Sequence, residues 1–204
     1  MTGSTINGEL IQQTINFHGH SCPGLAIGIR VAELALTEFD RASDEEIIAV
    51  VETDMCGVDA IQYLTGCTFG KGNLIHLDYG KSAFTFYRRS DGKGIRIMAR
   101  PEVFQDPDEE SSVLRKKKVK EKLTSEEKSR LRDATEYRKK RIMEASLKEL
   151  FEIKPVQGPM PKKARVLDSL TCQACGESTM ESRTRRFLGQ TLCFPCFEAM
   201  ERRH

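Results

Sequence analysis

Two pairs of cysteines near the C-terminus constrain the fold of this 204-residue chain more than any other feature. Residues 172–175 read CQAC and residues 193–196 read CFPC, which gives the spacing C-x2-C-x17-C-x2-C. Four thiolates arranged in a tetrahedron are typical of a structural zinc site. We therefore predict a four-cysteine zinc site made by Cys172, Cys175, Cys193 and Cys196. Two disulfides or two redox dithiols are the alternatives, and a reducing compartment disfavours them.

The residues around these cysteines indicate a small domain that depends on its metal. A domain of about forty residues buries little apolar surface, so metal binding would supply folding energy. The segment between the pairs is expected to form a hairpin, and FEAMERRH after Cys196 is expected to be a helix. This order is the treble-clef arrangement, and we assign the zinc-finger domain to residues 166–204.

Composition divides the rest of the chain into three parts. Residues 1–107 hold the apolar segments expected of an α+β core, and residues 108–153 are rich in Lys, Glu and Arg. In this charged helical extension, residues 124–127 fit a capping box that begins a helix near residue 125. Apolar residues at helical spacing continue to Phe151, which extends the predicted helix. Three prolines and a glycine in residues 154–165 predict a linker.

Periodicity within the core predicts helices packed on one mainly antiparallel sheet. Helices are expected over 8–17 and 23–39, and Pro23 suits the first position of the second. The β-branched run 47–53 predicts a buried strand, followed by a helix over 55–65 with Asp54 as its N-cap. The segments 73–80, 82–89 and 94–101 are expected to be consecutive strands joined by antiparallel hairpins.

Residues 17–24, FHGHSCPG, place His18, His20 and Cys22 immediately before the helix that begins at Pro23. Unpaired N–H groups and the helix dipole stabilise a thiolate at such a position. Cys56 has an equivalent place at the start of the next predicted helix. Histidine with soft sulfur ligands suits zinc or another late transition metal, and three protein ligands with an open position suit catalysis. A buried apolar cysteine and a hydrogen-bonded histidine are the structural alternative.

A glycine-punctuated loop, GCTFGKGN at residues 66–73, is a candidate anion site. It is not a phosphate-binding P-loop, because the glycine spacing is one residue short and a strand follows it. Its backbone N–H groups and Lys71 could still hold an anion. On spacing alone, a plain turn is the better prediction.

Taken together, residues 17–24, 51–73 and 77–86 resemble the FmdE family, named for one of the subunits of formylmethanofuran dehydrogenase. The resemblance covers roughly residues 10–150, and the C-terminal module is similar to one that some members carry. It implies an α+β core, usually dimeric, and an association with the first step of methanogenesis, in which CO2 is reduced and attached to methanofuran. It further implies one site in which His18, His20 and Cys22 match the first motif, Cys56 and Asp59 the second, and Cys67, Lys71 and Asn73 the third.

Charge is distributed unevenly along the chain. Residues 1–113 carry nine Lys or Arg and seventeen Asp or Glu, whereas residues 114–141 carry thirteen and five. A basic segment on an acidic body suggests a nucleic-acid or acidic-protein partner, or attraction between subunits. The finger arginines could also meet phosphates, although a solvated surface is the favoured interpretation: Arg183, Arg185, Arg186, Arg202 and Arg203.

Several expectations about location and assembly follow. No apolar run is long enough to span a membrane, and the N-terminus lacks a secretory signal, so we expect a cytoplasmic protein without a membrane partner. The resemblance implies a homodimer, and the long helix and the proline-rich linker suggest that its two chains exchange their zinc-finger domains. A larger enzyme complex is a further possible setting.

Three functions remain open from the sequence. The leading one is an FmdE-like metal-binding protein, either an accessory subunit or an enzyme for a small substrate. In it His18, His20, Cys22 and Cys56 hold a core metal, such as a second zinc, and Cys22, His20, Cys56 and Lys71 are the catalytic candidates. The second is metal-free thiol redox chemistry between Cys22 and Cys56. The third is a zinc-finger module that recruits nucleic acid or a protein.

Overall fold

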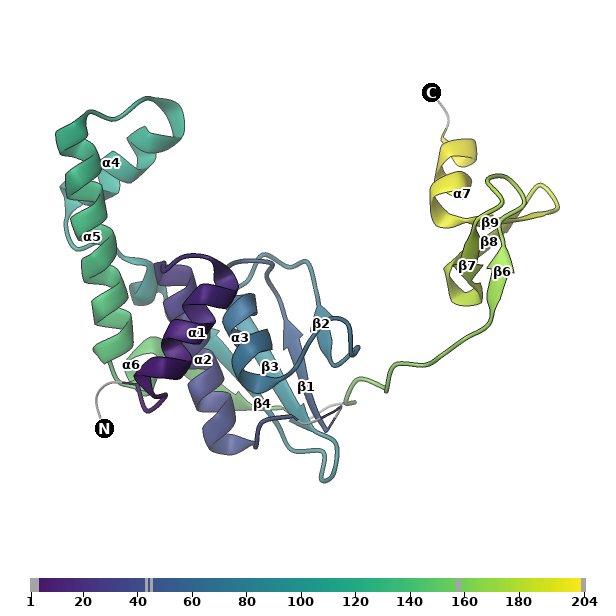
Figure 1. Ribbon diagram of the computed structural model, residues 1–204, viewed down its shortest axis with the longest axis horizontal. Coiled ribbons are helices and arrows are strands. Elements are labelled where there is room, and N and C mark those ends of the chain that lie inside the picture. The colour runs from purple at the N-terminus through teal and green to yellow at the C-terminus, as the bar shows by residue number, and fades with distance from the viewer. Residues whose placement is uncertain (1–3, 43, 45, 157–158, 203–204) are drawn as a thin grey trace. The chain divides into compact units, whose positions relative to one another are not determined.

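The computed structural model describes residues 4–42, 44, 46–156 and 159–202, and the chain divides after Lys163 into two compact units (Figure 1). Unit 1 contains the sheet and most of the helices, and unit 2 contains the four-cysteine segment. Among the described residues, no helix combines the length and apolar character needed to cross a bilayer.

Unit 1 is built on a five-stranded sheet in the order β2-β1-β3-β4-β5. All neighbouring pairs are antiparallel except β1 with β2, which confirms the predicted α+β class with a mainly antiparallel sheet. The strands are β1 (Ile47–Val51), β2 (Leu74–His76), β3 (Ala83–Arg88), β4 (Gly94–Ala99) and β5 (Phe151–Pro155).

Two details of the predicted sheet are wrong. The segments 73–80 and 82–89 do not form a hairpin, because β2 pairs in parallel with β1 while β3 pairs on the other side of β1. A parallel pair needs a crossover, and α3 (Gly57–Thr65) provides it between β1 and β2. Phe151 also does not continue a helix, since β5 begins there and pairs with β4. The hairpin of β3 and β4 is as predicted.

Three helices lie over one face of this sheet: α1 (Gly8–His18), α2 (Pro23–Glu38) and α3 (Figure 1). Nearly all of α2 is buried, since Leu25 to Ala35 are inaccessible in an unbroken run. Its apolar side chains pack on alternate residues of the strands, as the two-residue repeat of a strand requires. The sheet contributes Ile47, Ala49, Val51, Phe84, Phe86, Ile95 and Ile97 to this core.

The segment between β4 and β5 forms a helical arm of unit 1 (Figure 1). It consists of η1 (Pro101–Phe104), α4 (Glu109–Lys120), α5 (Ser125–Glu144) and α6 (Leu147–Leu150). The predicted capping box is present, because Thr124 accepts from the N–H of Glu127 and the Glu127 carboxylate accepts from the N–H of Thr124. The predicted continuation of this helix to Phe151 is wrong, since α5 ends at Glu144 and Ser146 caps the separate α6.

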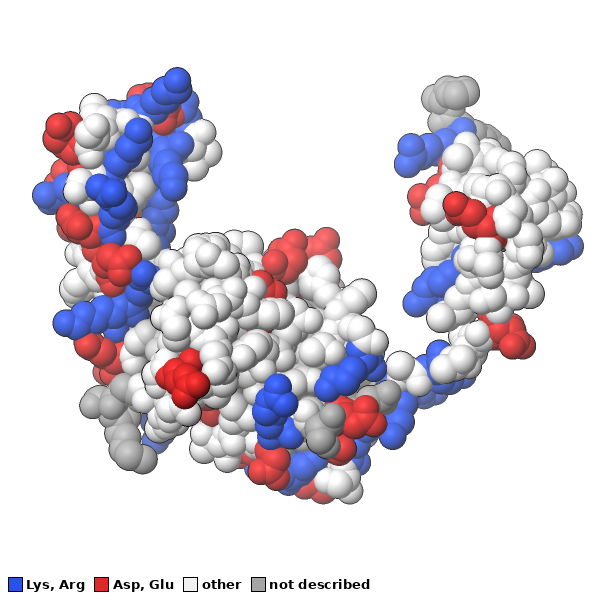
Figure 2. Space-filling view, in the orientation of Figure 1, with Lys and Arg blue, Asp and Glu red and all other residues white. Residues whose placement is uncertain are grey.

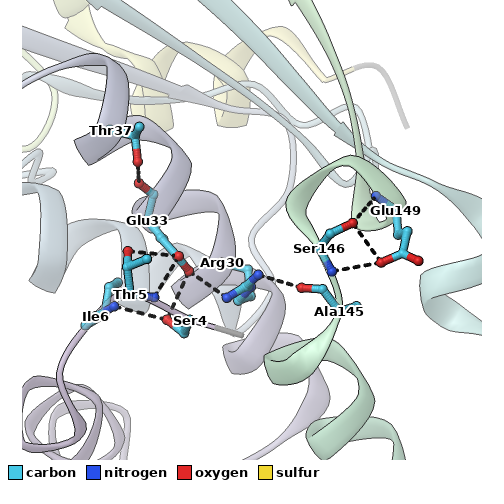
Figure 3. A network of polar contacts seen from close by, with 9 residues as sticks. All are labelled: Ser4, Thr5, Ile6, Arg30, Glu33, Thr37, Ala145, Ser146 and Glu149. Atoms are coloured by element: carbon cyan, nitrogen blue, oxygen red, sulfur yellow. Dashed lines mark hydrogen bonds and ion pairs between the residues drawn. The ribbon is translucent and has the colours of Figure 1, made fainter. Parts of the chain in front are cut away.

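A buried ion pair on α2 is hydrogen-bonded both to the N-terminal segment and to the end of α5 (Figure 3). Arg30 donates to Glu33 at 2.8 Å and to the carbonyl of Ala145 at 2.6 Å, and both charged side chains are almost inaccessible. The other Glu33 oxygen accepts from the N–H and hydroxyl of Thr5. Because a buried charge needs full hydrogen bonding, this network fixes the N-terminal segment and the end of α5 onto α2.

Unit 2 contains two short hairpins followed by a helix. Its elements are β6 (Ser169–Thr171), β7 (Ser178–Met180), η2 (Glu181–Arg183), β8 (Thr184–Phe187), β9 (Gln190–Cys193) and α7 (Phe194–Glu201). Its small core consists of the buried side chains of Cys172, Leu192 and Cys193, against which Phe187, Cys196 and Phe197 pack. The expected helix at the second cysteine pair is therefore present as α7, which begins directly after Cys193.

Candidate metal centres and an adjoining cavity

Four side chains converge where α1 ends and where α2 and α3 begin. One ligand atom from each of His18, His20, Cys22 and Cys56 lies within 4.8 Å of every other. The four come from two segments that are distant in sequence. This spacing of nitrogen and sulfur atoms suits a single ion with soft ligands.

Asp59 fixes the orientation of the His18 ring. Its Nδ1 lies 2.7 Å from Oδ2 of Asp59 on α3, while its Nε2 is buried and has no hydrogen-bond partner among the described residues. A buried ring nitrogen without a partner is unfavourable unless something else occupies its lone pair. A carboxylate that holds the far nitrogen of a ligand histidine is the usual outer partner in metal sites.

Both cysteines are N-caps of helices. The Sγ of Cys22 accepts from the N–H of Leu25 at 3.3 Å, which fulfils the expected position before Pro23. Cys56 precedes Gly57, the first residue of α3, so the predicted cap by Asp54 is wrong. Instead, Thr53 accepts from the N–H of Met55 and turns the chain after β1. The N-terminus of α2 therefore directs its positive end toward the Sγ of Cys22, whereas the side chain of Cys56 makes no cap hydrogen bond with α3.

The pKa of Cys56 is raised, first by burial and then by the neighbouring thiol of Cys22. In the absence of metal this thiol is therefore protonated more strongly than an ordinary cysteine. Because the nucleophile in disulfide exchange is the thiolate, the raised pKa disfavours Cys56 as the attacking thiol. A bound cation would reverse this preference, since it deprotonates a coordinating thiol.

Close contact between glycines brings the two helix starts together. A methyl group on Gly24 would lie 3.8 Å from the Sγ of Cys56 and 3.9 Å from that of Cys22. One turn further along α2, Gly28 touches the backbone of Gly57. Small residues at these positions allow α2 and α3 to cross at backbone contact, which places both cysteines at one point.

Three residues of the third motif lie near the start of β1, at its opposite end. Phe69 of the same motif instead lines a cavity together with His18 and Cys56. The Lys71 ammonium donates to the carbonyl of Asp44, and the buried amide of Asn73 donates to the carbonyls of Asp44 and Ile47. The thiol of Cys67 is buried and donates to the same Ile47 carbonyl. Since β1 alone spans about 13 Å, these contacts do not bring Lys71 to the His–Cys cluster, contrary to the expectation of one site.

Residues of α5 reach the cluster, and sequence reasoning missed them. The Lys139 ammonium lies 3.2 Å from the hydroxyl of Ser21, beside Cys22. Arg138 lines a cavity of about 490 Å³ that adjoins the cluster. The available signal was its position, because Ala134, Arg138 and Ile142 follow one another at four-residue spacing and form the buried stripe of α5. An arginine within an apolar stripe indicates a buried charge.

The four cysteines of unit 2 also converge, with their Sγ atoms within 4.8 Å of one another. The N–H of Cys193 donates to the Sγ of Cys172 at 3.3 Å, and backbone hydrogen bonds from Cys175 and Cys193 lower the pKa of Cys172 to about 6. The neighbouring thiols raise the pKa of Cys196 to about 12. Four sulfur atoms this close together can all be negatively charged only if a cation lies between them, as in structural zinc sites.

The finger arginines make several local contacts. Arg185 lies over the ring of Phe194 at 4.5 Å, and Arg186 donates to the hydroxyl of Thr191. Arg183 contacts the neighbouring Ser182. Arg203 lies outside the described residues.

An α+β core followed by a compact four-cysteine finger defines this chain as a two-unit protein with a C4-type zinc finger. The sequence model described as "FmdE, Molybdenum formylmethanofuran dehydrogenase operon" matches residues 17–152, and that of the prokaryotic dksA/traR C4-type zinc finger matches residues 168–202. The chain belongs to the FmdE family. The resemblance found in the sequence motifs is thereby confirmed.

Two known proteins are similar to this chain, and the second is described as FmdE-like. The chain is 32% identical over 200 residues to a protein of Archaeoglobus fulgidus described as a probable S-adenosyl-L-methionine-binding protein, covering 92% of this chain and 52% of the relative. It therefore spans about half the length of that relative. It also resembles the crystal structure of a tungsten formylmethanofuran dehydrogenase FmdE-like protein from Syntrophus aciditrophicus, with a TM-score of 0.61, 25% identity and full coverage of both chains.

Proposed function

We propose that the FmdE core binds one metal ion, zinc or another late transition metal, through His18, His20, Cys22 and Cys56. The observation that carries this proposal is the buried Nε2 of His18, which lacks a partner among the described residues while Asp59 holds the other ring nitrogen. A carboxylate–histidine pair beside two thiols is the donor set of a transition-metal site. When bound, such an ion would act as a Lewis acid toward a small ligand.

The four candidate ligands differ in exposure, which suggests different roles. His18, Cys22 and Cys56 are partly buried, whereas His20 is exposed and follows the left-handed Gly19 that ends α1. Three fixed ligands and one accessible ligand suit a site where a small molecule replaces the fourth donor. We therefore favour a small-substrate enzyme, or an accessory protein related to the FmdE component of formylmethanofuran dehydrogenase, over a purely structural core site.

Metal content of purified full-length protein tests the proposal. We expect about two ions per chain, one in each cluster, because each offers a complete donor set. Cys22→Ala and His18→Ala should each lower the content to about one, and Cys172→Ala should do the same through the finger. Cys67→Ala is the matched control, since this buried cysteine lies outside both clusters. A wild-type chain whose only metal disappears with Cys172→Ala would refute the core site.

We further propose a cytoplasmic homodimer in which the zinc-finger domains are exchanged. The described surface near the cluster carries exposed apolar side chains that a second copy would cover, among them Phe17, Met55 and Phe69. Sedimentation equilibrium measures the number of chains in the assembly. Chains labelled in unit 1 can then be mixed with chains labelled in unit 2, and the proximity of the two labels distinguishes exchanged zinc-finger domains from simple pairing. A monomer at micromolar concentration would contradict the proposal.

A basic surface supports a second candidate function, recruitment of a polyanion. Figure 2 shows blue side chains gathered over the arm formed by α4 and α5. Exposed cations there include Lys116, Lys118, Lys120, Lys122, Lys128 and Arg132. Nucleic-acid binding through this arm should weaken steeply as salt rises, because counterions are released. Charge reversal at Lys118 and Lys122 should abolish it, and absence of binding at low salt would exclude it.

A further inference from the structure

The cavity beside the core cluster has apolar walls and one buried cation. It encloses about 490 Å³ and is lined by Met55, Phe84 and Phe104 together with Arg138 from α5. Gly24 and Gly57 also line it, so it lies beside the two helix starts that carry Cys22 and Cys56, and neither cysteine is itself a lining residue. Such a site, mostly apolar with a single charged group, has the character of a small-molecule pocket.

Arg138 is incompletely paired within the protein. Its side chain is 10% exposed, and its Nε is buried with no hydrogen-bond partner among the described residues. The nearest carboxylate, Asp106, lies 4.0 Å from its Nη1 and is in closer contact with Arg115. Burial and the neighbouring Arg115 and Arg141 lower the pKa of Arg138 to about 10. The site therefore carries excess positive charge and an unused donor, which favours an anion.

We propose that this cavity binds a small organic carboxylate, whose charged group pairs with Arg138 and whose apolar part contacts Met55, Phe84 and Phe104. An inorganic anion would leave these apolar walls without a partner, whereas a neutral molecule would leave the guanidinium unpaired. Binding of the carboxylate does not require the proposed metal centre. Its link to function rests on that proposal, because the carboxylate would then be the class of small molecule held beside the metal.

Calorimetric titration of the full-length protein with butyrate tests the inference. We expect saturable binding that Arg138→Gln weakens at least about tenfold, since hydrogen bonds to a charged group are lost. Arg132→Gln is the matched control, because Arg132 is exposed on the same helix. The neutral analogue 1-butanol should bind at least about tenfold more weakly.

A second pair of variants keeps the experiment decisive if Arg138→Gln does not fold. Met55 lines the cavity and is 64% exposed, so it tolerates polar replacement. Met55→Glu should weaken butyrate binding more than Met55→Gln does, because the two side chains have similar size and only the glutamate repels the carboxylate of the ligand.

Three results would overturn the carboxylate site: no binding by the wild type, equal affinity for Arg138→Gln, or tighter binding of inorganic phosphate than of butyrate. The metal content of the same preparations separates the two proposals. Butyrate binding without a core metal contradicts the metal centre alone, and a retained core metal without butyrate binding contradicts the carboxylate site alone.

Discussion

Gly28 on α2 and Gly57 on α3 are in direct backbone contact: a methyl group built on Gly28 would lie 2.2 Å from the carbonyl oxygen of Gly57. This contact sets the distance between the two helices. Because Cys22 and Cys56 cap the same two helices, the glycine pair also sets the distance between the two thiols. The geometry of the candidate core site therefore depends on residues that carry no functional group.

Gly28→Ala should separate α2 and α3. Overpacking a closed contact costs about 2 kcal/mol of unfolding free energy, and displacement of Cys22 from Cys56 should lower core metal content as well. Urea unfolding and metal analysis measure the two effects. Gly8→Ala is the control, because nothing lies within 4 Å of a methyl group there. Equal stability of the two variants would contradict the close crossing.

Asp59→Asn should weaken core metal binding without unfolding the protein. The carboxylate orients His18 through Nδ1, and loss of such an outer partner typically reduces metal affinity by about 10- to 100-fold. Competition with a chromophoric chelator measures the affinity. The exposed Asp78 supplies the control as Asp78→Asn. Unchanged affinity in Asp59→Asn would show that His18 is not a ligand.

Glu33→Gln should be strongly destabilising. Removal of its charge leaves Arg30 buried without a counterion, which costs about 3 kcal/mol. Glu38→Gln on the same helix breaks only the exposed pair with Lys93 and should change stability by about 0.5 kcal/mol or less. Chemical denaturation compares the two. Similar losses for both variants would contradict the structural role of the buried pair.

Cys67 should make stability fall at alkaline pH. Its thiol has an ordinary pKa of 9.0, which burial raises in the folded protein. A raised pKa stabilises the fold fully below pH 9.0, and this contribution is lost as pH rises through the folded value. Cys67→Ala, expected to lose about 1 kcal/mol at neutral pH, should therefore approach the wild type as pH increases. Urea unfolding at about pH 7.5 and about pH 10 measures the difference, and a constant gap would argue against burial of the thiol.

Removal of metal should unfold unit 2 and leave the sheet of unit 1 intact. Unit 2 has only a small apolar cluster around Leu192 among its described residues, so its stability depends on the four cysteines. Limited proteolysis after chelation should cut between residues 164 and 204 and preserve a fragment that ends near Lys163. Re-addition of zinc should restore resistance. Protection that persists in Cys175→Ser would contradict a structural metal.

Local sequence signals predicted much of the fold. Pro23 and the helical periodicity of the apolar residues identified α2, the β-branched run identified β1, and Thr124 with Glu127 identified the start of α5. These signals are reliable because they are local: the cap, the helical repeat and the β-branched run each lie within the element that they predict. The grouping of His18, His20, Cys22 and Cys56 was also anticipated, since both cysteines were expected at helix starts.

Non-local pairing could not be read in the same way. Residues 151–155 are too short to show a clear alternation, and their strand character comes from hydrogen bonds with β4. In the sequence, Lys71 lies only a short distance after Cys56. The parallel pairing of β2 with β1 nevertheless places the loop that carries Lys71 at the start of β1. Arg138 carries no motif, and only the packing of α5 reveals that it lines a cavity.

The placement of the arm between β4 and β5 has an evolutionary consequence. Because those two strands pair directly, the arm forms the whole connection between two antiparallel neighbours. The four candidate metal ligands all precede it in the chain, whereas Arg138 belongs to it. Substitutions at the cavity-facing positions of this one connection could therefore change which molecules reach the candidate metal centre while its ligands stay the same.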